Sequence, residues 1–339
     1  MRIYNSFNEL IKHKQQEQRS VVITIGFFDG VHLGHQRLLQ ELLRLSVSTN
    51  TDAVVVTFTE QPGKVLHPER PAPVVLSSVA NKLRYMSYCG ISNVVLLNFT
   101  PQLARLSAEE FIAPLLHSQL LKGIVMGYDN TFGYSPKPLN LYDFDKMIAS
   151  WRVKLLRIPP LWIGHRVVSS TTIRKHITSC EFPVAERLLG RPYSFLGKVE
   201  YGQQIGRTID YPTANITPLE PDIFLPEIGI YVSEVRIGNK VYPAMSYYGS
   251  RPTIASGQPL RLEAFLLDFT GDLYGQCVEI GFKAFLRGDK RFGSLDELAQ
   301  QIQKDEIQTR AYFREHSLTL PTDPKNQLEE IMNTLSGKS

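Results

Sequence analysis

Residues 21–35 read VVITIGFFDGVHLGH, and this stretch decides the fold of the first half of the chain. Five β-branched residues predict a buried strand, and Gly26 and Gly30 allow the backbone a tight turn. A helical pattern, QRLLQELLRL, follows from Gln36. Since a strand that passes through a glycine-rich turn into a helix is typical of α/β domains, we expect one here.

The rest of the first half repeats this alternation. Further short apolar runs predict strands at residues 53–58, 94–97, 123–126 and 153–158. Apolar residues at helical spacing predict helices at residues 36–45, 79–89, 108–116 and 141–151, and a short helical pair at residues 169–189. The alternation predicts a parallel sheet with helices on both faces. Ligands bind such sheets at the carboxyl ends of the strands, so the site should lie just after Ile25.

The pattern changes to that of an all-β domain from Tyr193 onward. Strand candidates lie at residues 195–201, 230–237, 240–248, 261–269 and 277–286, separated by turn residues. They predict a small antiparallel β-barrel, closed by one amphipathic helix at about residues 295–314. The expected domains are therefore residues 1–186 and 187–320, followed by a polar tail at residues 321–339.

The composition indicates an ordinary globular protein. Of the 339 residues 43% are hydrophobic and 21% charged, which argues against long disorder. The net charge is only +4 and the basic residues are scattered, so no nucleic-acid partner is expected. No apolar run approaches the length of a membrane span. The three cysteines are too few and too far apart for a disulfide framework or a metal knuckle. We therefore expect the protein in the reducing cytoplasm. The sequence indicates no oligomeric state.

His32 and His35 stand at the start of the first helix, directly after the glycine-rich turn. Side chains three residues apart share one helix face, and the helix N-terminus offers free N–H groups to an anion. Two imidazoles there can donate hydrogen bonds to charge that develops on a phosphorus centre. The pair therefore suits nucleotidyl transfer, although a histidine pair by itself is about as often a helix cap.

A second phosphate-binding candidate is the segment SSTTIR at residues 169–174, which opens another helix. Hydroxyl groups at a helix N-terminus and the guanidinium of Arg174 can hold further phosphates of a triphosphate. By itself, such a segment would more often be a capped helix.

Together, GFFDGVHLGH and SSTTIR resemble the nucleotidyltransferase superfamily and, more narrowly, the bacterial bifunctional FAD synthetases. The resemblance implies a Rossmann-like FMN adenylyltransferase domain, in which the FMN phosphate attacks the α-phosphorus of ATP and pyrophosphate leaves. It assigns catalytic roles to His32, His35 and Arg174. The ATP-binding residues that it implies are Gly26, Phe27, Phe28, Asp29, Gly34, Ser169, Ser170 and Thr171.

The flavin side of this domain departs from the family pattern. Residues 127–133, GYDNTFG, resemble the family segment GxDFxFG, which implies that Asp129 and Phe132 bind FMN. Asn130 replaces the usual aromatic residue, and the glycine and arginine that usually follow are absent from residues 134–139. Residues 57–62 read TFTEQP where the family shows TFxPHP. One alternative is therefore the same fold with riboflavin kinase activity only and a weakened adenylyltransferase.

Residues 202–215, GQQIGRTIDYPTAN, predict a second phosphate site. A loop with two glycines can wrap phosphates, and the oxygen atoms of Thr213 and Asn215 are hard ligands that suit Mg²⁺. The segment resembles the GxxxGRxxGxPTAN signature of riboflavin kinases, with Asp210 in place of the last loop glycine. The resemblance implies a kinase-type barrel and a set of ATP-binding residues: Gly202, Gly206, Arg207 and Pro212.

Glu263, in the strand segment LEAFLLDF, stands at the position of the riboflavin kinases' catalytic glutamate. Phosphorylation of a primary hydroxyl needs a group that accepts its proton, and a carboxylate within reach can do this. Without that motif, an exposed strand glutamate would be the more common interpretation. Asp268 should face away from Glu263 along a regular strand and have a structural role. Tyr247 replaces a small polar residue of the family before Arg251-Pro252-Thr253.

The two signatures predict a two-step enzyme. ATP and riboflavin would give FMN in the second module, and ATP and FMN would give FAD in the first, with Mg²⁺ in both steps. The implied partners are the small molecules riboflavin, FMN and ATP. A flavin- or nucleotide-binding regulator without turnover is a further alternative, but it would not need the full set of chemistry-bearing residues.

Overall fold

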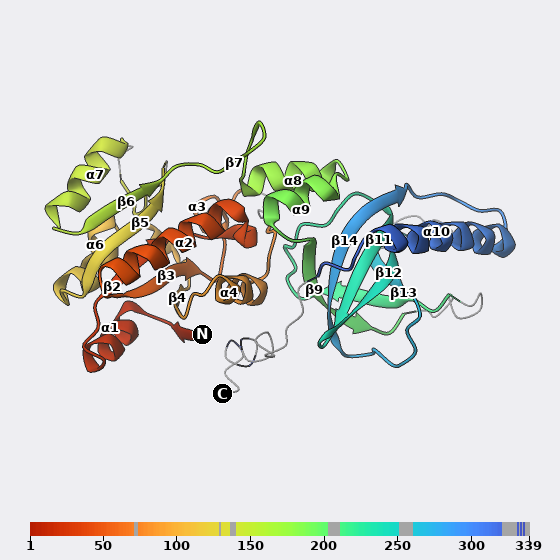
Figure 1. The fold of residues 1–339 in the computed structure, drawn as a ribbon, viewed down its shortest axis with the longest axis horizontal. Coiled ribbons are helices and arrows are strands. Elements are labelled where there is room, and N and C mark those ends of the chain that lie inside the picture. The colour runs from red at the N-terminus through yellow and green to blue at the C-terminus, as the bar shows by residue number, and fades with distance from the viewer. Residues whose placement is uncertain are drawn as a thin grey trace. The chain divides into compact units, whose positions relative to one another are not determined.

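The computed structural model describes residues 1–70, 74–128, 130–135, 140–202, 211–250 and 260–320, together with residues 331, 333 and 335. The chain divides into two compact units, labelled by element in Figure 1. The first unit comprises Met1–Val75 and Lys82–Val168, and the second comprises Leu76–Asn81 and Ser169–Ser339. Each unit is described on its own.

The first unit is built on a six-stranded sheet with the strand order β1-β4-β3-β2-β5-β6. Every pair of neighbours is parallel, which confirms the predicted parallel sheet. The strands are β1 (Arg2–Tyr4), β2 (Val21–Ile25), β3 (Asp52–Phe58), β4 (Asn93–Leu97), β5 (Leu121–Gly127) and β6 (Lys154–Ile158). The three-residue edge strand β1 was not predicted, because so short a segment has no readable periodicity.

Helices connect these strands in the predicted alternation. They are α1 (Phe7–Gln16), α2 (Leu33–Ser48), α3 (Pro62–Leu66), α4 (Val79–Tyr88), α5 (Pro101–Ala104), α6 (Ala108–His117) and α7 (Leu141–Ser150), with a 3₁₀ turn, η1 (Asp29–Val31), before α2. Local sequence fixes where several of them begin. The Ser107 side chain accepts the N–H of Glu110 and the Glu110 carboxylate accepts that of Ser107, so α6 starts with a capping box. A hairpin of β7 (Trp162–Ile163) and β8 (Arg166–Val167) ends the unit.

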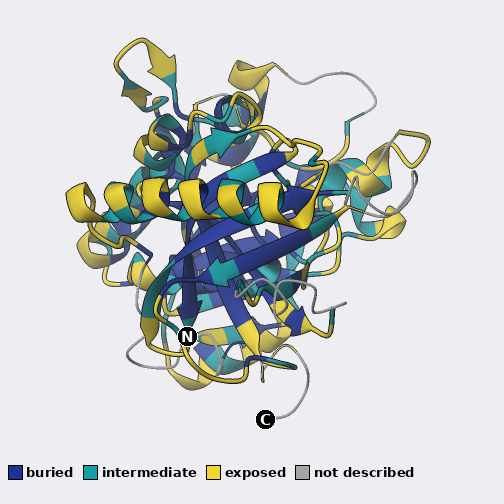
Figure 2. Cartoon of the chain, turned by 90° about the vertical axis from the view of Figure 1, so that its right-hand side faces the viewer, coloured by how far each residue is buried: buried dark blue, intermediate teal, exposed yellow. Residues whose placement is uncertain are grey.

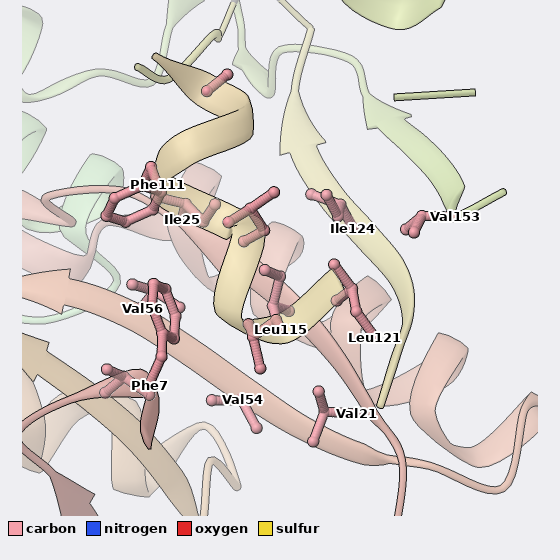
Figure 3. Close-up of a cluster of buried hydrophobic side chains, with 14 of the residues drawn as sticks. Phe7, Val21, Ile25, Val54, Val56, Phe111, Leu115, Leu121, Ile124 and Val153 are labelled. Atoms are coloured by element: carbon pink, nitrogen blue, oxygen red, sulfur yellow. The ribbon is translucent and has the colours of Figure 1, made fainter. Parts of the chain in front are cut away.

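The core of the first unit lies on both faces of the sheet. Alternate residues of β2 point to opposite faces, and Val21, Ile23 and Ile25 enter one apolar cluster with α1 and α6. Figure 3 shows Phe111 of α6 in this cluster together with strand side chains such as Ile25. On the other face α2 comes so close to β5 that a Cβ atom on Gly123 would lie 3.1 Å from Leu45. Burial on both faces explains why β2 has no polar alternation.

The second unit contains a closed antiparallel barrel with the strand order β10-β13-β12-β11-β14-β9, which confirms the predicted barrel. Its strands are β9 (Tyr193–Glu200), β10 (Ala214–Pro218), β11 (Gly229–Ile237), β12 (Lys240–Gly249), β13 (Arg261–Leu266) and β14 (Cys277–Arg287). Strand β10 was not predicted, because the sequence ANITP has a single large apolar side chain. Strand β13 ends at Leu266, so the predicted strand at residues 261–269 was too long.

Three helices accompany the barrel: α8 (Ser170–Thr178), α9 (Phe182–Leu189) and α10 (Leu295–Glu315). The ring of Phe182 in α9 stacks on Phe282 of β14, with centroids 5.8 Å apart. Helix α10 packs on the barrel and confirms the predicted closing helix; Figure 2 shows buried residues gathered in strands and exposed residues on outer helix faces. Among the described residues, no helix is long and apolar enough to cross a bilayer.

After α10 the chain returns to the barrel wall. The carboxylate of Glu234, in β11, accepts the N–H groups of Thr319 and Leu320 at 2.9 and 2.7 Å. Burial raises the pKa of Glu234, while these two N–H groups oppose that rise. Leu320 covers Gly281 of β14, where a Cβ atom would lie 3.0 Å from the leucine side chain. The barrel therefore extends in sequence to residue 320. Of the tail at residues 321–339, only 331, 333 and 335 are described, and they are helical.

Candidate active sites

The turn after β2 has an unusual backbone. The N–H of Gly26 donates to the carbonyl of Val56 at 3.1 Å, which holds the turn to the end of β3. Phe28 and Val31 then adopt left-handed φ angles of 56° and 39°, and Gly30 one of 76°. Side chains rarely accept this conformation, a β-branched valine least of all, and such strain concentrates at functional sites.

The two histidines of this turn lie against each other. His32 caps α2, since its Nδ1 accepts the backbone N–H of His35 at 3.3 Å. The two imidazole rings are stacked, with centroids 3.6 Å apart and planes inclined by 15°. Because Nδ1 of His32 is an acceptor, the neutral ring carries its proton on Nε2. The pair therefore has the form of a hydrogen-bond donor site at a helix N-terminus.

Close packing holds the rings of the histidine pair in place. A Cβ atom on Gly34 would lie 3.2 Å from the His32 ring and 3.3 Å from the carbonyl of Val168, so glycine leaves room for the imidazole. The ring of Phe28 meets that of His35 edge to face at 5.2 Å. His32 is only 5% exposed and Asp29 is also buried. Phe28 and Gly34, two of the predicted ATP-binding residues, therefore lie against the histidine rings, and the contacts of this turn with ATP stay a prediction.

The SSTTIR segment begins the second unit as a capped helix. The Oγ of Ser169 accepts the N–H of Thr172 at 3.2 Å, and Ser170 and Thr171 occupy the first turn of α8. Arg174 follows on the next turn and is half-buried. The segment has the predicted local form, with hydroxyl groups at a helix N-terminus. Its binding of ATP phosphates stays a prediction.

The predicted flavin segment is held by core packing. Phe132 packs between Phe111 and Phe144, with ring centroids 5.8 and 5.3 Å away. Gly133 has a φ of 82°, and a Cβ atom there would lie 2.2 Å from the backbone nitrogen of Ala108. Phe132 therefore anchors the segment in the apolar cluster. Its predicted contact with FMN is untested, and Asp129 lies outside the described residues.

Arg157, in β6, also holds this segment, and the sequence did not single it out. Its Nη1 donates to the carbonyls of Gly127 and Asn130 at 3.0 and 2.6 Å. The same guanidinium binds the Asp145 carboxylate, with the shortest contact at 2.6 Å. Backbone carbonyls leave no mark in a sequence, so nothing in the sequence could have shown these partners.

The second candidate site lies on one face of the barrel, where β10 pairs with β13. Asn215 stands directly opposite Glu263 in the strand register. Residues that face each other across antiparallel strands put their side chains on the same side of the sheet. The Oγ1 of Thr213 donates to the Glu263 carboxylate at 2.9 Å. The barrel thus brings together three residues that the sequence predicted as metal ligands and general base.

Gly202 lets Asn215 occupy this place. A Cβ atom on Gly202 would lie 2.1 Å from Nδ2 of Asn215, which any larger residue would displace. Among the residues that the structure describes, the buried Oδ1 of Asn215 has no hydrogen-bond partner. Gly206 and Arg207, the other predicted loop residues, lie outside those residues.

A cavity of about 290 Å³ opens beside Thr213. Aromatic and aliphatic side chains line most of it, among them Pro212, Phe265, Phe269, Leu273 and Tyr274. The ring of Tyr201, just before Gly202, stacks on that of Tyr274 with centroids 3.9 Å apart. A cleft that combines apolar side chains with polar groups such as those of Thr213 and Asp272 is a suitable form for a small-ligand site.

Helix α10 fixes the residue before Pro212. The Tyr211 hydroxyl donates to the Glu306 carboxylate at 3.0 Å, and burial, helped by this bond, raises the pKa of Tyr211. Arg310 binds both Glu306 and Asp268. Its hydrogen bonds hold the pKa of the exposed Asp268 below its usual value. Asp268 lies in a turn with a φ of 57°, not in a regular strand, so the argument from strand alternation does not apply to it.

Tyr247 lies beside Glu263 on the next strand, β12, directly opposite it in register. The Tyr247 hydroxyl donates to the carbonyl of Ser250 at 3.0 Å and also faces the Asp289 carboxylate at 3.3 Å. Tyr247 therefore lies on the same side of the sheet as Glu263.

Both units match known families. The family model for FAD synthetase matches residues 14–172 and that for riboflavin kinase matches residues 189–313. The bifunctional riboflavin kinase/FMN adenylyltransferase of Escherichia coli strain K12 is 36% identical over 301 residues, which cover 88% of this chain and 95% of that protein. The protein of the same name from Listeria monocytogenes is 32% identical over 292 residues, covering 86% and 92%.

A solved structure shows the same fold. A crystal structure described as a macrolide-efflux protein from Streptococcus pneumoniae superimposes with a TM-score of 0.77 and 33% identity, covering 86% of this chain and 94% of that one. The curated relatives are matched over nearly their whole length, and the two family models follow each other along the chain in the predicted order. The chain therefore belongs to the family of bifunctional riboflavin kinase/FMN adenylyltransferases.

Proposed function

We propose that this enzyme makes FMN in the domain of residues 187–320 and FAD in the domain of residues 1–186. Membership of the family supports both activities in one chain, and a regulator without turnover is not retained. ATP and riboflavin give FMN and ADP; ATP and FMN give FAD and pyrophosphate. The observation that carries the assignment of the kinase is the cluster of Thr213, Asn215 and Glu263 on one face of the barrel.

Glu263 is the proposed general base of the kinase. Its carboxylate accepts the proton of the primary hydroxyl of riboflavin while that oxygen attacks the γ-phosphorus of ATP. A new O–P bond forms, the bond from the γ-phosphorus to ADP breaks, and ADP leaves. The hydrogen bond from Thr213 orients the carboxylate for this step. Such a base contributes about 10²–10⁴-fold to the rate.

Thr213 and Asn215 are the proposed Mg²⁺ ligands. The buried Oδ1 of Asn215 is an oxygen acceptor without a partner among the described residues, which fits a hard cation. The metal would supply positive charge to the ATP phosphates. Gly202, with Gly206, Arg207 and Pro212, would hold the nucleotide, with its base in the cavity beside Thr213.

Gly202→Ala tests this metal site. The added methyl group has no room beside Asn215, so the asparagine side chain must move from its place. We expect the Mg²⁺ concentration for half-maximal FMN formation to rise by about tenfold, equivalent to about 1.4 kcal/mol. A titration of FMN formation with Mg²⁺ measures this. Gly288→Ala is the matched control, since nothing lies within 4 Å of a Cβ atom there. An unchanged Mg²⁺ requirement in Gly202→Ala would count against Asn215 as a ligand.

His32 and His35 are the proposed centre of adenylyl transfer. They donate hydrogen bonds to the α-phosphate of ATP while an oxygen of the FMN phosphate attacks the α-phosphorus. The bond from the α-phosphorus to pyrophosphate breaks, and FAD forms. Arg174 would balance the charge of the leaving pyrophosphate. The residues proposed to hold ATP are Gly26, Phe27, Phe28, Asp29, Gly34, Ser169, Ser170 and Thr171, and those proposed to hold FMN are Asp129 and Phe132.

Product analysis of the unmodified enzyme distinguishes the hypothesis of two activities from the alternative of riboflavin kinase activity alone. With riboflavin, ATP and Mg²⁺, we expect FMN to appear first and to be converted to FAD, because the chain matches the family models of both enzymes. Chromatography of the flavins over time measures this. If the product stopped at FMN even with excess ATP, the altered flavin segment would mark a weakened adenylyltransferase.

The domain limits are proposed at residues 1–186 and 187–320. The gap between the two family matches, at residues 173–188, supports a boundary near residue 186. A cytoplasmic location is proposed as well. It is supported by the three cysteines, all described, which carry no disulfide.

A further inference from the structure

A buried lysine lies under the turn of the first unit. Lys82, in α4, is only 2% exposed. Its ammonium group donates to the carbonyl of Phe58 at 2.7 Å and to that of Phe27 at 3.1 Å. Phe58 ends β3 and Phe27 follows β2 by two residues, so one side chain joins the carboxyl ends of two neighbouring strands.

Lys82 holds Phe27 in a second way. Its Nζ lies 4.2 Å from the centroid of the Phe27 ring, which is a cation–π contact. The Phe27 carbonyl also accepts the hydroxyl of Thr57, at 3.2 Å. Lys82 and Thr57 therefore hold the backbone carbonyl of Phe27, and Lys82 also holds its ring. Burial of an ammonium group away from water costs free energy. A lysine at this turn is therefore expected to have a role beyond packing.

The fixed carbonyl determines where the next N–H points. The peptide between Phe27 and Phe28 is trans, so its C=O and N–H point in opposite directions. With the oxygen turned to Lys82 and Thr57, the N–H of Phe28 points to the other side of the turn. Phe28 itself is left-handed and its ring meets His35. A change in this peptide plane would thus move both a backbone donor and a neighbour of the histidine pair.

We propose that Lys82 is a positioning residue of the adenylyltransferase site: it holds the Phe27–Phe28 peptide so that its N–H donates to a phosphate of ATP. The lysine acts through this peptide and does not touch the substrate. The inference rests on the proposed role of His32 and His35. It adds a residue that no motif in the chain pointed to.

Lys82→Met is the test. Methionine keeps an unbranched apolar stem but removes the ammonium group, so the Phe27 carbonyl loses one donor and the ring loses its cation. We expect the kcat for conversion of supplied FMN to FAD to fall by about 100-fold, with a smaller change in the KM for ATP. Thr57→Val should lower kcat in the same direction and by less. Thermal unfolding followed by circular dichroism reports whether the variant is folded, and FMN formation from riboflavin reports that the barrel domain is intact.

Lys14→Met is the matched control. Lys14 is another buried lysine of the first unit, 3% exposed, and it pairs with Asp52 at the amino end of β3, away from the turn. Removal of this charge should lower the unfolding temperature but leave the kcat of FAD formation within about threefold, because the carboxylates that Lys14 binds among the described residues, Asp52 and Glu17, lie at the amino ends of the strands. A purely structural role of Lys82 would make the two variants alike.

The outcomes separate the inference from the function on which it rests. If the unmodified enzyme forms no FAD from FMN and ATP, the proposed adenylyltransferase site fails and the role of Lys82 fails with it. If the unmodified enzyme forms FAD and Lys82→Met keeps its kcat within about threefold, or Lys14→Met loses as much, only the role of Lys82 is overturned.

Discussion

For Glu263→Gln we expect the rate of FMN formation from riboflavin to fall by about 10³-fold, while supplied FMN is still converted to FAD. The amide keeps the volume of the carboxylate and can still accept the Thr213 hydroxyl. It cannot take a proton from the ribityl hydroxyl at neutral pH. A loss of this size corresponds to about 4 kcal/mol of transition-state stabilisation. Initial rates of FMN production, measured by chromatography with saturating ATP, give the result.

Glu315→Gln is the matched control for this variant. Glu315 is the last residue of α10 and is exposed. The same chemical change there should leave FMN formation within about threefold, because substitutions of exposed surface residues have small effects. If Glu263→Gln retained more than a third of the wild-type rate, another group would have to be the base.

His32→Asn has the opposite effect: FMN accumulates and FAD formation falls by about 10²–10³-fold, as expected for the loss of a donor to developing charge. Asparagine is chosen because His32 also caps α2 through its side chain. Asparagine is among the best N-cap residues, so the helix should remain and only the imidazole is lost. Rates of FAD formation from supplied FMN measure the effect.

His32→Ala removes both the imidazole and the cap, so it should be less stable than His32→Asn by about 1 kcal/mol but equally inactive in FAD formation. Thermal unfolding and the kinase rate of both variants complete the comparison. Should either variant lose both activities while still folded, the model of two independent sites would be wrong.

Much of the fold follows from local patterns. The β-branched run at Val21–Ile25 predicted its strand without error, and the amphipathic pattern of α10 was read to within one residue at its end. These elements are long or fully buried, so periodicity shows them clearly. The short strands β1 and β10 were missed, because their pairing with β4 and with β9 and β13 defines them rather than their composition.

The candidate sites were predicted unequally. The motifs singled out His32 and Glu263, because catalysis needs particular side chains at particular spacings; their catalytic roles stay a prediction. Arg157 and Lys82 were not found, since both bind backbone carbonyls, which every residue has. The link from Tyr211 to Glu306 was also invisible, because the two residues are 95 positions apart and meet only where α10 crosses the barrel.

The sequence by itself therefore determined the local structure. The left-handed turn needs Gly30, the helix caps need Ser169 and Ser107, and the buried strands need β-branched residues. The hydrogen bond from Thr213 to Glu263 joins residues 50 positions apart, and the clamp of Lys82 on Phe27 joins residues 55 positions apart. Only tertiary structure decides such contacts. They depend on strand register and on closure of the barrel and sheet, which arise from the packing of the whole unit and not from any one segment.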